Sequence, residues 1–354
     1  MADGGRRQRR AYIGSFTAAG GPGVVTAAVE PRSGALTVLN RVNGVPDPSY
    51  LALSPGGGML YAVSETTDGA VAAYRVTSDV PEPAGPPVPV DGSGPTHLSV
   101  YAGHVLTANY GSGSVTAVPL HPDGSLADAP SGVLQHHGSG PHSPRQQQPH
   151  AHQVQPDPSG RWAVSVDLGT DSVRVCTLTD GTLVPHREIA LRPGFGPRHL
   201  VFHPAGRYAY VAGELTPAVT VCRWDAADGT LKPLAEMPVL AVAPSGDAYP
   251  SGVVASPDGR FVWTATRGED VLSVFAVEGE SLRLTATVPC GGHWPRALTE
   301  SDGVLYVANE RSGDVTWFRV DPDTGLPMRA GSVAVPAASC VVVRTGGVTD
   351  GVTP

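Results

Sequence analysis

The chain has 354 residues, of which 41% are hydrophobic and only 16% are charged, and it contains 44 glycines and 35 prolines. Many short strands joined by tight turns require this abundance of Gly and Pro. The formal net charge of −8 argues against a surface built to neutralise nucleic-acid phosphates. No apolar run approaches the roughly 18 residues of a membrane helix. We therefore expect no nucleic-acid partner and no membrane partner.

The two ends of the chain differ from the rest in composition. Residues 1–10 are basic, but no signal-peptide apolar region or cleavage pattern follows them. We expect a disordered basic tail at 1–10, a disordered tail at 346–354, and a cytoplasmic protein. The cysteines lack the spacing of a zinc site or a disulfide framework, and we expect four buried free thiols: Cys176, Cys222, Cys290 and Cys340.

A repeated plan organises the chain. Its clearest copy, residues 196–214, has an alternating apolar run, a Pro-x-Gly turn, a second apolar run and a carboxylate at the end. The copies recur about every 41 to 54 residues, which with short strands is typical of propeller blades. Their lead prolines are Pro48, Pro95, Pro149, Pro197, Pro250, Pro295 and Pro336.

The ends of the array indicate how the ring closes. Residues 336–344 look like a first strand with nothing after it, and residues 11–16, 23–29 and 35–39 supply a second, third and fourth strand. The sequence therefore predicts an all-β, seven-bladed β-propeller with four-stranded blades, in which the N- and C-terminal segments share one blade. We expect a single domain over 11–345, and a monomer, because a closed ring needs no partner.

Two segments are longer than the repeat requires. The stretch 80–89 is a proline-rich connection in which no chemistry is visible. The stretch 136–152 is a polar, histidine-rich insertion before the fourth blade, and we expect it to hang over one end of the channel. His150 and His152 alternate on a strand start, but no third ligand lies close, so we expect no metal site.

Aligning the repeats brings polar residues to one end of the ring. The first residues of the inner strands form one ring, which contains Ser49, Thr96, His152, Arg198, Ser251 and Arg296. The ends of the second strands form another, which contains Glu65, Tyr110, Asp167, Glu214, Arg267 and Glu310. A scaffold needs nothing polar there, and charges gathered in a partly dry cleft tune one another's pKa values. Compensating ion pairs along a wet channel are the alternative explanation.

Five phrases together resemble the seven-bladed lactonase family. They are 12–17 (YIGSFT), 149–152 (PHAH), 196–200 (GPRHL), 256–260 (SPDGR) and 294–296 (WPR). That family groups bacterial propeller-type 6-phosphogluconolactonases with fungal 3-carboxy-cis,cis-muconate lactonising enzymes. The resemblance extends from about Tyr12 to about Val343. It implies an active site at the channel mouth that uses neither a metal nor a cofactor.

The resemblance also implies roles for individual residues. The family's catalytic positions fall on His152, Arg198, Glu214 and Arg267. The last arginine usually follows Asn in the family but follows Thr266 here, which leaves Arg296 as the competing candidate. We expect the remaining charged ring residues to bind substrate: Arg296, Asp167, Glu310 and Glu65.

The implied reaction is hydrolysis of a small anionic sugar lactone such as 6-phosphogluconolactone. Arg198, helped by Arg267 or Arg296, would stabilise the oxyanion, and Glu214 or His152 would act as general base. No Gly-x-Ser-x-Gly turn is present, so we expect no acyl-enzyme. Two alternatives remain open. The same residues could close or isomerise a carboxylated unsaturated acid, or the protein could be a non-catalytic binding propeller with an exposed patch around Trp224, Trp263 or Trp317.

Overall fold

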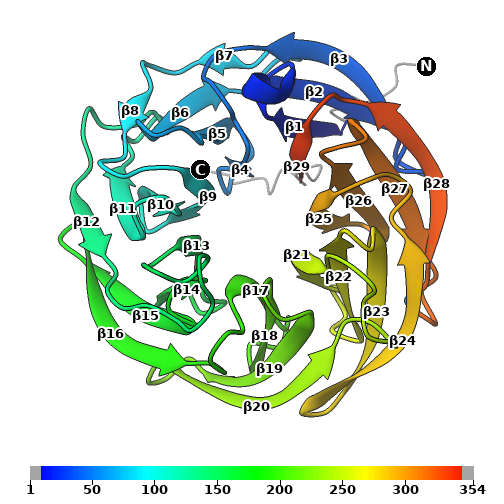
Figure 1. The fold of residues 1–354 in the computed structure, drawn as a ribbon. Coiled ribbons are helices and arrows are strands. Elements are labelled where there is room, and N and C mark those ends of the chain that lie inside the picture. The colour runs from blue at the N-terminus through cyan, green and yellow to red at the C-terminus, as the bar shows by residue number, and fades with distance from the viewer. Residues whose placement is uncertain (1–8, 345–354) are drawn as a thin grey trace, which may run out of the picture.

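The structure is a computed structural model that describes residues 9–344. Seven antiparallel sheets stand around a central axis (Figure 1), which confirms the predicted seven-bladed propeller. The only helix in residues 9–344 is a single 3-10 turn, η1 (Thr17–Ala19). This turn is neither long nor apolar enough to cross a membrane.

The blades are numbered here along the chain, and each is given from its innermost to its outermost strand. Blade 1 contains β29 (Ala338–Arg344), β1 (Arg10–Ser15), β2 (Val24–Val29) and β3 (Leu36–Val42). Blade 2 contains β4 (Leu51–Leu53), β5 (Met59–Ser64), β6 (Ala70–Arg75), β7 (Glu82–Pro83) and β8 (Val88–Pro89). Blade 3 contains β9 (Pro95–Tyr101), β10 (His104–Asn109), β11 (Ser114–Pro119) and β12 (Gly132–Gln135).

The second half of the ring repeats this order. Blade 4 contains β13 (Ala151–Pro156), β14 (Ala163–Asp167), β15 (Ser172–Thr179) and β16 (Thr182–Ala190). Blade 5 contains β17 (Pro197–Phe202), β18 (Tyr208–Gly213), β19 (Ala218–Asp225) and β20 (Thr230–Pro238). Blade 6 contains β21 (Tyr249–Ala255), β22 (Phe261–Arg267), β23 (Val271–Glu278) and β24 (Ser281–Pro289). Blade 7 contains β25 (Pro295–Ser301), β26 (Val304–Asn309), β27 (Asp314–Val320) and β28 (Pro327–Ala334).

Local sequence explains the hairpins that connect these strands. The turn between β25 and β26 has φ values of 51° at Asp302 and 76° at Gly303, and the turn at Asp180 and Gly181 has 51° and 77°. Two successive residues with positive φ form the tight turn that matches the twist of paired strands, and Asp-Gly favours it. These turns fix the register of the hairpins.

The first and last strands share blade 1, as predicted. β29 (red in Figure 1) lies beside β1, and Ile13 pairs with Val341. The expected tails, 1–10 and 346–354, lie outside the described residues except for their edge at the N-terminus. There, Arg10 begins β1, and Arg9 Nη2 lies 2.7 Å from Asp302 Oδ2 in blade 7. The blade therefore begins before residue 11.

The proline-rich stretch 80–89 is more than a connection. Its two pieces, β7 and β8, both pair with β6 and form an interrupted outer strand of blade 2. Proline lacks an N–H donor and is confined to sheet edges, which explains both the position and the interruption. Blade 2 therefore keeps the four-layer plan of the other blades.

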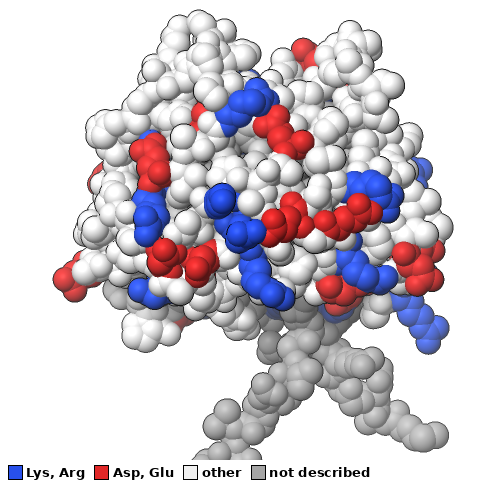
Figure 2. All heavy atoms as spheres, turned by 90° about the horizontal axis from the view of Figure 1, so that it is seen from below, with Lys and Arg blue, Asp and Glu red and all other residues white. Residues whose placement is uncertain are grey.

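Apolar faces of neighbouring blades form the core. Trp224, Trp263 and Trp317 are only 3%, 1% and 6% exposed, so none of them forms the exposed patch that a binding propeller would require. All four cysteines are free and buried, as predicted. Exposed ion pairs such as Arg192–Glu236 lie on the surface, and Figure 2 shows both signs of charge interspersed over one side of the molecule.

Candidate active site at the start of the inner strands

A β-bulge at the start of the inner strand positions one side chain in several blades. In β17 the pairing with β18 shifts around Arg198, which is left as the extra residue. Thr96 in β9, His152 in β13 and Arg296 in β25 are the extra residues at the same place. A bulge re-aims a side chain away from the regular alternation of the strand. Four of the six residues in the first ring of the repeat alignment thus occupy bulge positions.

Glu214, directly after β18, lies among three arginines, which we call the arginine cluster. Its Oε2 atom lies 3.1 Å from Arg198 Nε and 2.9 Å from Arg267 Nη2. Its Oε1 atom lies 2.6 Å from Arg145 Nη2. The side chains of Arg198 and Arg267 are 3% and 8% exposed, whereas that of Arg145 is 36% exposed. The carboxylate therefore separates two buried guanidiniums from one that reaches solvent.

The arginine cluster contains more positive than negative charge, because three guanidiniums surround one carboxylate. Burial, and then the neighbouring Arg267, lower the pKa of Arg198 to about 9. Burial raises the pKa of Glu214, but Arg267, Arg198 and Arg145 outweigh it and hold that pKa well below its usual range. An anionic ligand would supply the missing negative charge.

We expect Glu214→Gln to lower the free energy of unfolding by about 3–5 kcal/mol, because a neutral amide leaves buried guanidiniums without their carboxylate. Since folding lowers the pKa of Glu214, its contribution is complete above the ordinary carboxyl pKa and is lost as the pH falls towards the folded-state value. Urea unfolding at neutral pH measures the difference. The control is Glu236→Gln, which breaks the exposed pair with Arg192; an equal loss in both variants would contradict the assignment.

A second charged group is centred on Arg296. Its Nη1 and Nη2 atoms lie 3.1 Å from Glu310 Oε2 and 3.4 Å from Glu65 Oε1, and its guanidinium lies 4.6 Å from the ring centroid of Phe16. Ser49 donates a hydrogen bond to Glu65, and burial raises the pKa of that carboxyl. Because two carboxylates face one guanidinium, this group attracts an anion less than the arginine cluster does.

Three buried histidines lie beside Arg198. The ring centroid of His199 is 5.3 Å from that of His152 and 5.7 Å from that of His97. Burial and then Arg198 lower the pKa of all three imidazoles, to about 3 for His97 and well below the usual range for His152 and His199. They are therefore neutral at pH 7. The buried Nδ1 of His152 has no hydrogen-bond partner among the described residues.

The sequence reasoning missed two of these histidines. His97 and His199 each follow a first-ring residue directly, in the phrases Thr-His-Leu and Arg-His-Leu, and that recurrence was the available signal. His150 instead stacks on Tyr110, with ring centroids 4.2 Å apart. Within residues 9–344, no three His, Cys, Asp or Glu side chains are arranged to hold a metal ion.

The insertion before blade 4 reaches this site. Its residues 136–150, which we call the strap, join β12 to β13. From the strap, Arg145 extends to Glu214 in blade 5. It also donates a hydrogen bond to Tyr110 Oη in blade 3, at 3.2 Å. The next residue, Gln146, is fully buried and donates from Nε2 to Asp171 Oδ1 at 2.7 Å. The sequence predicted that the insertion overhangs the channel but assigned no role to Arg145.

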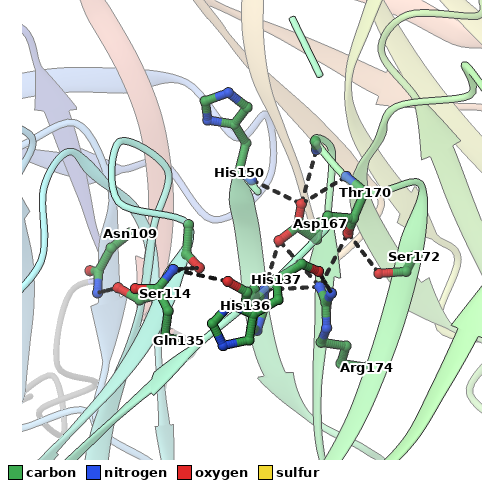
Figure 3. A network of polar contacts seen from close by, with 12 residues as sticks. Asn109, Ser114, Gln135, His136, His137, His150, Asp167, Thr170, Ser172 and Arg174 are labelled. Carbon is green, nitrogen blue, oxygen red and sulfur yellow. Dashed lines mark hydrogen bonds and ion pairs between the residues drawn. The ribbon is translucent and has the colours of Figure 1, made fainter. Parts of the chain in front are cut away.

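Asp167 does not join either charged group. Its Oδ1 atom accepts three backbone N–H groups, from the end of the strap and the following turn, at 2.9–3.1 Å. Its Oδ2 atom lies 2.7 Å from His136 Nδ1 and 3.2 Å from Arg174 Nη1. Figure 3 shows these contacts converging on the carboxylate. Asp167 therefore ties the strap to blade 4.

The strand register explains this difference from the sequence prediction. Asp167 is the last residue of β14, which is the position of Asn109 in blade 3 and Gly213 in blade 5. The counterpart of Glu214 in blade 4 is the following residue, Leu168, so the repeat alignment was wrong by one residue in this blade. Successive side chains in a strand point to opposite faces, and a shift of one residue changes the environment completely.

We expect Asp167→Asn to destabilise the protein by about 3–5 kcal/mol, because the amide cannot balance Arg174, and its NH₂ group would face either the backbone donors at Oδ1 or the guanidinium at Oδ2. Burial alone would raise the pKa of Asp167, but the hydrogen bond and the charge of His136, with the other contacts of the carboxylate, outweigh burial. Folding therefore lowers this pKa. The stabilisation is therefore present above the ordinary carboxyl pKa and is lost as the pH falls below it. Thermal unfolding between pH 7 and pH 3 measures this loss. A variant as stable as the wild type that binds substrate more weakly would restore Asp167 as a substrate ligand.

The structure thus brings seven of the eight predicted site residues into two neighbouring groups and leaves Asp167 apart. The first group contains His152, Arg198, Glu214 and Arg267, and the second contains Arg296, Glu65 and Glu310.

A cavity of about 530 Å³ adjoins the arginine cluster on the loops of blades 6 and 7. The connection is Trp294, whose ring centroid lies 5.6 Å from Arg267 Cζ. The wall of the cavity includes Asp247, Glu269, Asp270, His293, Trp294 and Arg311. Three carboxylates repel an anion, so the arginine cluster, and not this cavity, is the candidate site for an anionic group.

Comparisons with known proteins identify the family of the chain. The family model described as "Lactonase, 7-bladed beta-propeller" matches residues 10–343. The 6-phosphogluconolactonase of Bacillus subtilis is 34% identical over 342 residues, which cover 93% of this chain and 97% of that protein. The 6-phosphogluconolactonase of Formosa agariphila is 30% identical over 337 residues, covering 89% of this chain and 93% of that protein.

Solved structures give the same result. The periplasmic gluconolactonase of Pseudomonas aeruginosa superposes with a TM-score of 0.87 at 28% identity, covering 96% of this chain and 99% of that one. A protein from Lactobacillus plantarum superposes with a TM-score of 0.90 at 28% identity, covering 96% of this chain and 100% of that one. The chain therefore belongs to the lactonase family of seven-bladed β-propellers.

Proposed function

We propose that this protein hydrolyses a small anionic sugar lactone of the 6-phosphogluconolactone type at the arginine cluster. The observation that carries the proposal is the pair of buried guanidiniums, Arg198 and Arg267, held on one oxygen of Glu214 beside the neutral His152. The names of the Bacillus subtilis and Formosa agariphila relatives, both 6-phosphogluconolactonases, support this substrate class.

Arg198 and Arg267 stabilise the oxyanion that forms when water adds to the lactone carbonyl. Glu214 holds both guanidiniums before the substrate arrives, so little reorganisation is needed as charge develops. Because their side chains are nearly inaccessible to solvent, bulk water screens this interaction weakly. The arrangement therefore favours the tetrahedral intermediate over the neutral ester.

His152, and not Glu214, acts as the general base. Guanidiniums occupy both oxygens of Glu214, so neither oxygen is available to the attacking water, whereas His152 is neutral and makes no ion pair within residues 9–344. The imidazole of His152 takes a proton from the attacking water as the new C–O bond forms. When the intermediate collapses, the ring C–O bond breaks, and the imidazolium returns its proton to the leaving ring oxygen. The product is the open-chain hydroxy acid.

The test of the proposal is hydrolysis of 6-phosphogluconolactone followed by pH-stat, beside uncharged gluconolactone, with the spontaneous rates subtracted. We expect the purified protein to accelerate hydrolysis of the phosphorylated lactone. No acceleration with either lactone would refute the proposal. Turnover of a carboxylated muconate in the same preparation would then indicate ring closure as the activity.

The proposal extends to location and assembly. We propose a cytoplasmic monomer that binds a small anionic lactone or carboxylate and has neither a nucleic-acid nor a membrane partner. The free state of all four cysteines supports a reducing compartment, although the Pseudomonas aeruginosa relative is periplasmic. Cell fractionation tests the location, and light scattering on the purified protein tests the monomer.

A further inference from the structure

The two oxygens of Glu214 hold arginines in different surroundings. Oε2 faces the buried pair Arg198 and Arg267, whereas Oε1 holds Arg145, which comes from the strap and is 36% exposed. A ligand that approaches from solvent therefore meets the guanidinium of Arg145 before the buried ones. The exposed arginine and the two buried arginines are therefore suited to bind different parts of one ligand.

Arg145 still has donors to offer. Its contacts with Glu214 Oε1 and Tyr110 Oη both use Nη2. Within residues 9–344, its Nε and Nη1 atoms make no hydrogen bond. A guanidinium presents its N–H groups in a fixed fork that matches the oxygens of a phosphate. The free side of this fork can accept an anion without breaking the bond to Glu214.

The strap holds Arg145 in place before any ligand binds. The backbone N–H of Gln146 donates to His142 O at 2.7 Å, and Gln146 O accepts from Gly140 N at 2.9 Å. The side chain of Gln146 is anchored on Asp171 at 2.7 Å. The residue adjacent to Arg145 is therefore fixed by both its main chain and its side chain, which reduces the entropy lost when Arg145 binds an anion.

We propose that Arg145 binds the phosphate of the substrate and thereby selects phosphorylated over uncharged lactones. This inference rests on the proposed function. In the δ-lactone the phosphate, on C6, and the carbonyl, at C1, flank the ring oxygen, so the exposed arginine can hold the phosphate while the buried pair, on the other oxygen of the same carboxylate, acts on the carbonyl. A phosphate dianion also supplies the negative charge that the arginine cluster lacks.

The experiment compares the wild type with Arg145→Met and Arg145→Lys on 6-phosphogluconolactone and on uncharged gluconolactone. We expect Arg145→Met to lower kcat/KM for the phosphorylated lactone by about 10- to 100-fold, mainly through KM, because it removes charged hydrogen bonds to the ligand. Gluconolactone hydrolysis should change little, and Arg145→Lys should restore part of the loss. Arg192→Met, which removes an arginine of the exposed Glu236 pair, is the matched charge control.

A second readout does not depend on turnover. Inorganic phosphate should raise the Tm of the wild type and of Arg192→Met, and should raise that of Arg145→Met much less. Equal losses on both lactones, or an unchanged phosphate response in Arg145→Met, would overturn the role of Arg145 while leaving lactone hydrolysis intact. If the wild type hydrolyses neither lactone, the proposed function fails, and the phosphate measurement alone decides whether Arg145 binds an anion.

Discussion

Arg198→Met is expected to lower kcat for 6-phosphogluconolactone by about 10²- to 10³-fold, the usual cost of removing one preorganised oxyanion donor. The loss should fall mainly on kcat, because Arg198 acts on charge that develops in the transition state. We also expect the variant to fold. Methionine keeps an apolar stem at the buried position, and the substitution removes one of the surplus positive charges of the arginine cluster. Steady-state kinetics by pH-stat measure the effect.

Two controls separate catalysis from structure in this experiment. Arg192→Met removes an exposed arginine from the loop that leads into β17, the strand of Arg198. This variant should leave kcat unchanged. Arg198→Lys keeps the charge but loses the forked donors, so it should recover only part of the rate. An Arg198→Met enzyme with wild-type kcat and a raised KM would show that Arg198 only binds the ground state.

The second large effect is expected at His152. His152→Gln should lower kcat by about 10²- to 10⁴-fold, because the amide cannot accept the proton of the attacking water. Burial and then Arg198 lower the pKa of His152, so its basic form is present at neutral pH and is lost only as the pH falls well below 6.5. The wild-type profile of kcat/KM should therefore be flat around neutrality, with an acid limb that disappears in the variant.

His137→Gln is the matched control for this prediction, because His137 is an exposed histidine of the strap. It should preserve both the rate and the acid limb. Glu214→Gln should retain the acid limb even where its rate is reduced. If Glu214→Gln removed that limb and His152→Gln kept it, Glu214 would be the general base and our assignment would be wrong.

The sequence predicted the fold well because each repeat encodes the same local plan. Apolar strands and turns that contain glycine recur around the ring, and the incomplete ends identified the shared blade 1. The outer strand of blade 2 was not predicted, because the prolines of 80–89 obscure strand character and leave only the short pairings of β7 and β8. Edge strands tolerate proline in a way that strand patterns do not reveal.

The site was predictable where it follows the repeat. Arg198 and Arg296 sit at equivalent bulges, so aligning the copies placed them together. Asp167 lies apart from the two charged groups because one residue of register decides which face a side chain occupies, and local sequence does not fix that register. Arg145 could not be predicted as a site residue, for a different reason. It lies on a long insertion whose path depends on tertiary contacts, such as that of Gln146, and not on the repeat.

The most direct test of this account is a crystal structure of the protein with 6-phosphogluconate, the product of the proposed reaction. The account predicts that the product carboxylate contacts Arg198 and Arg267 and that the phosphate contacts Arg145. Product bound in the cavity beside Trp294, with the arginine cluster unoccupied, would contradict the account, because it would place the lactone among carboxylates and away from the residues proposed to act on it.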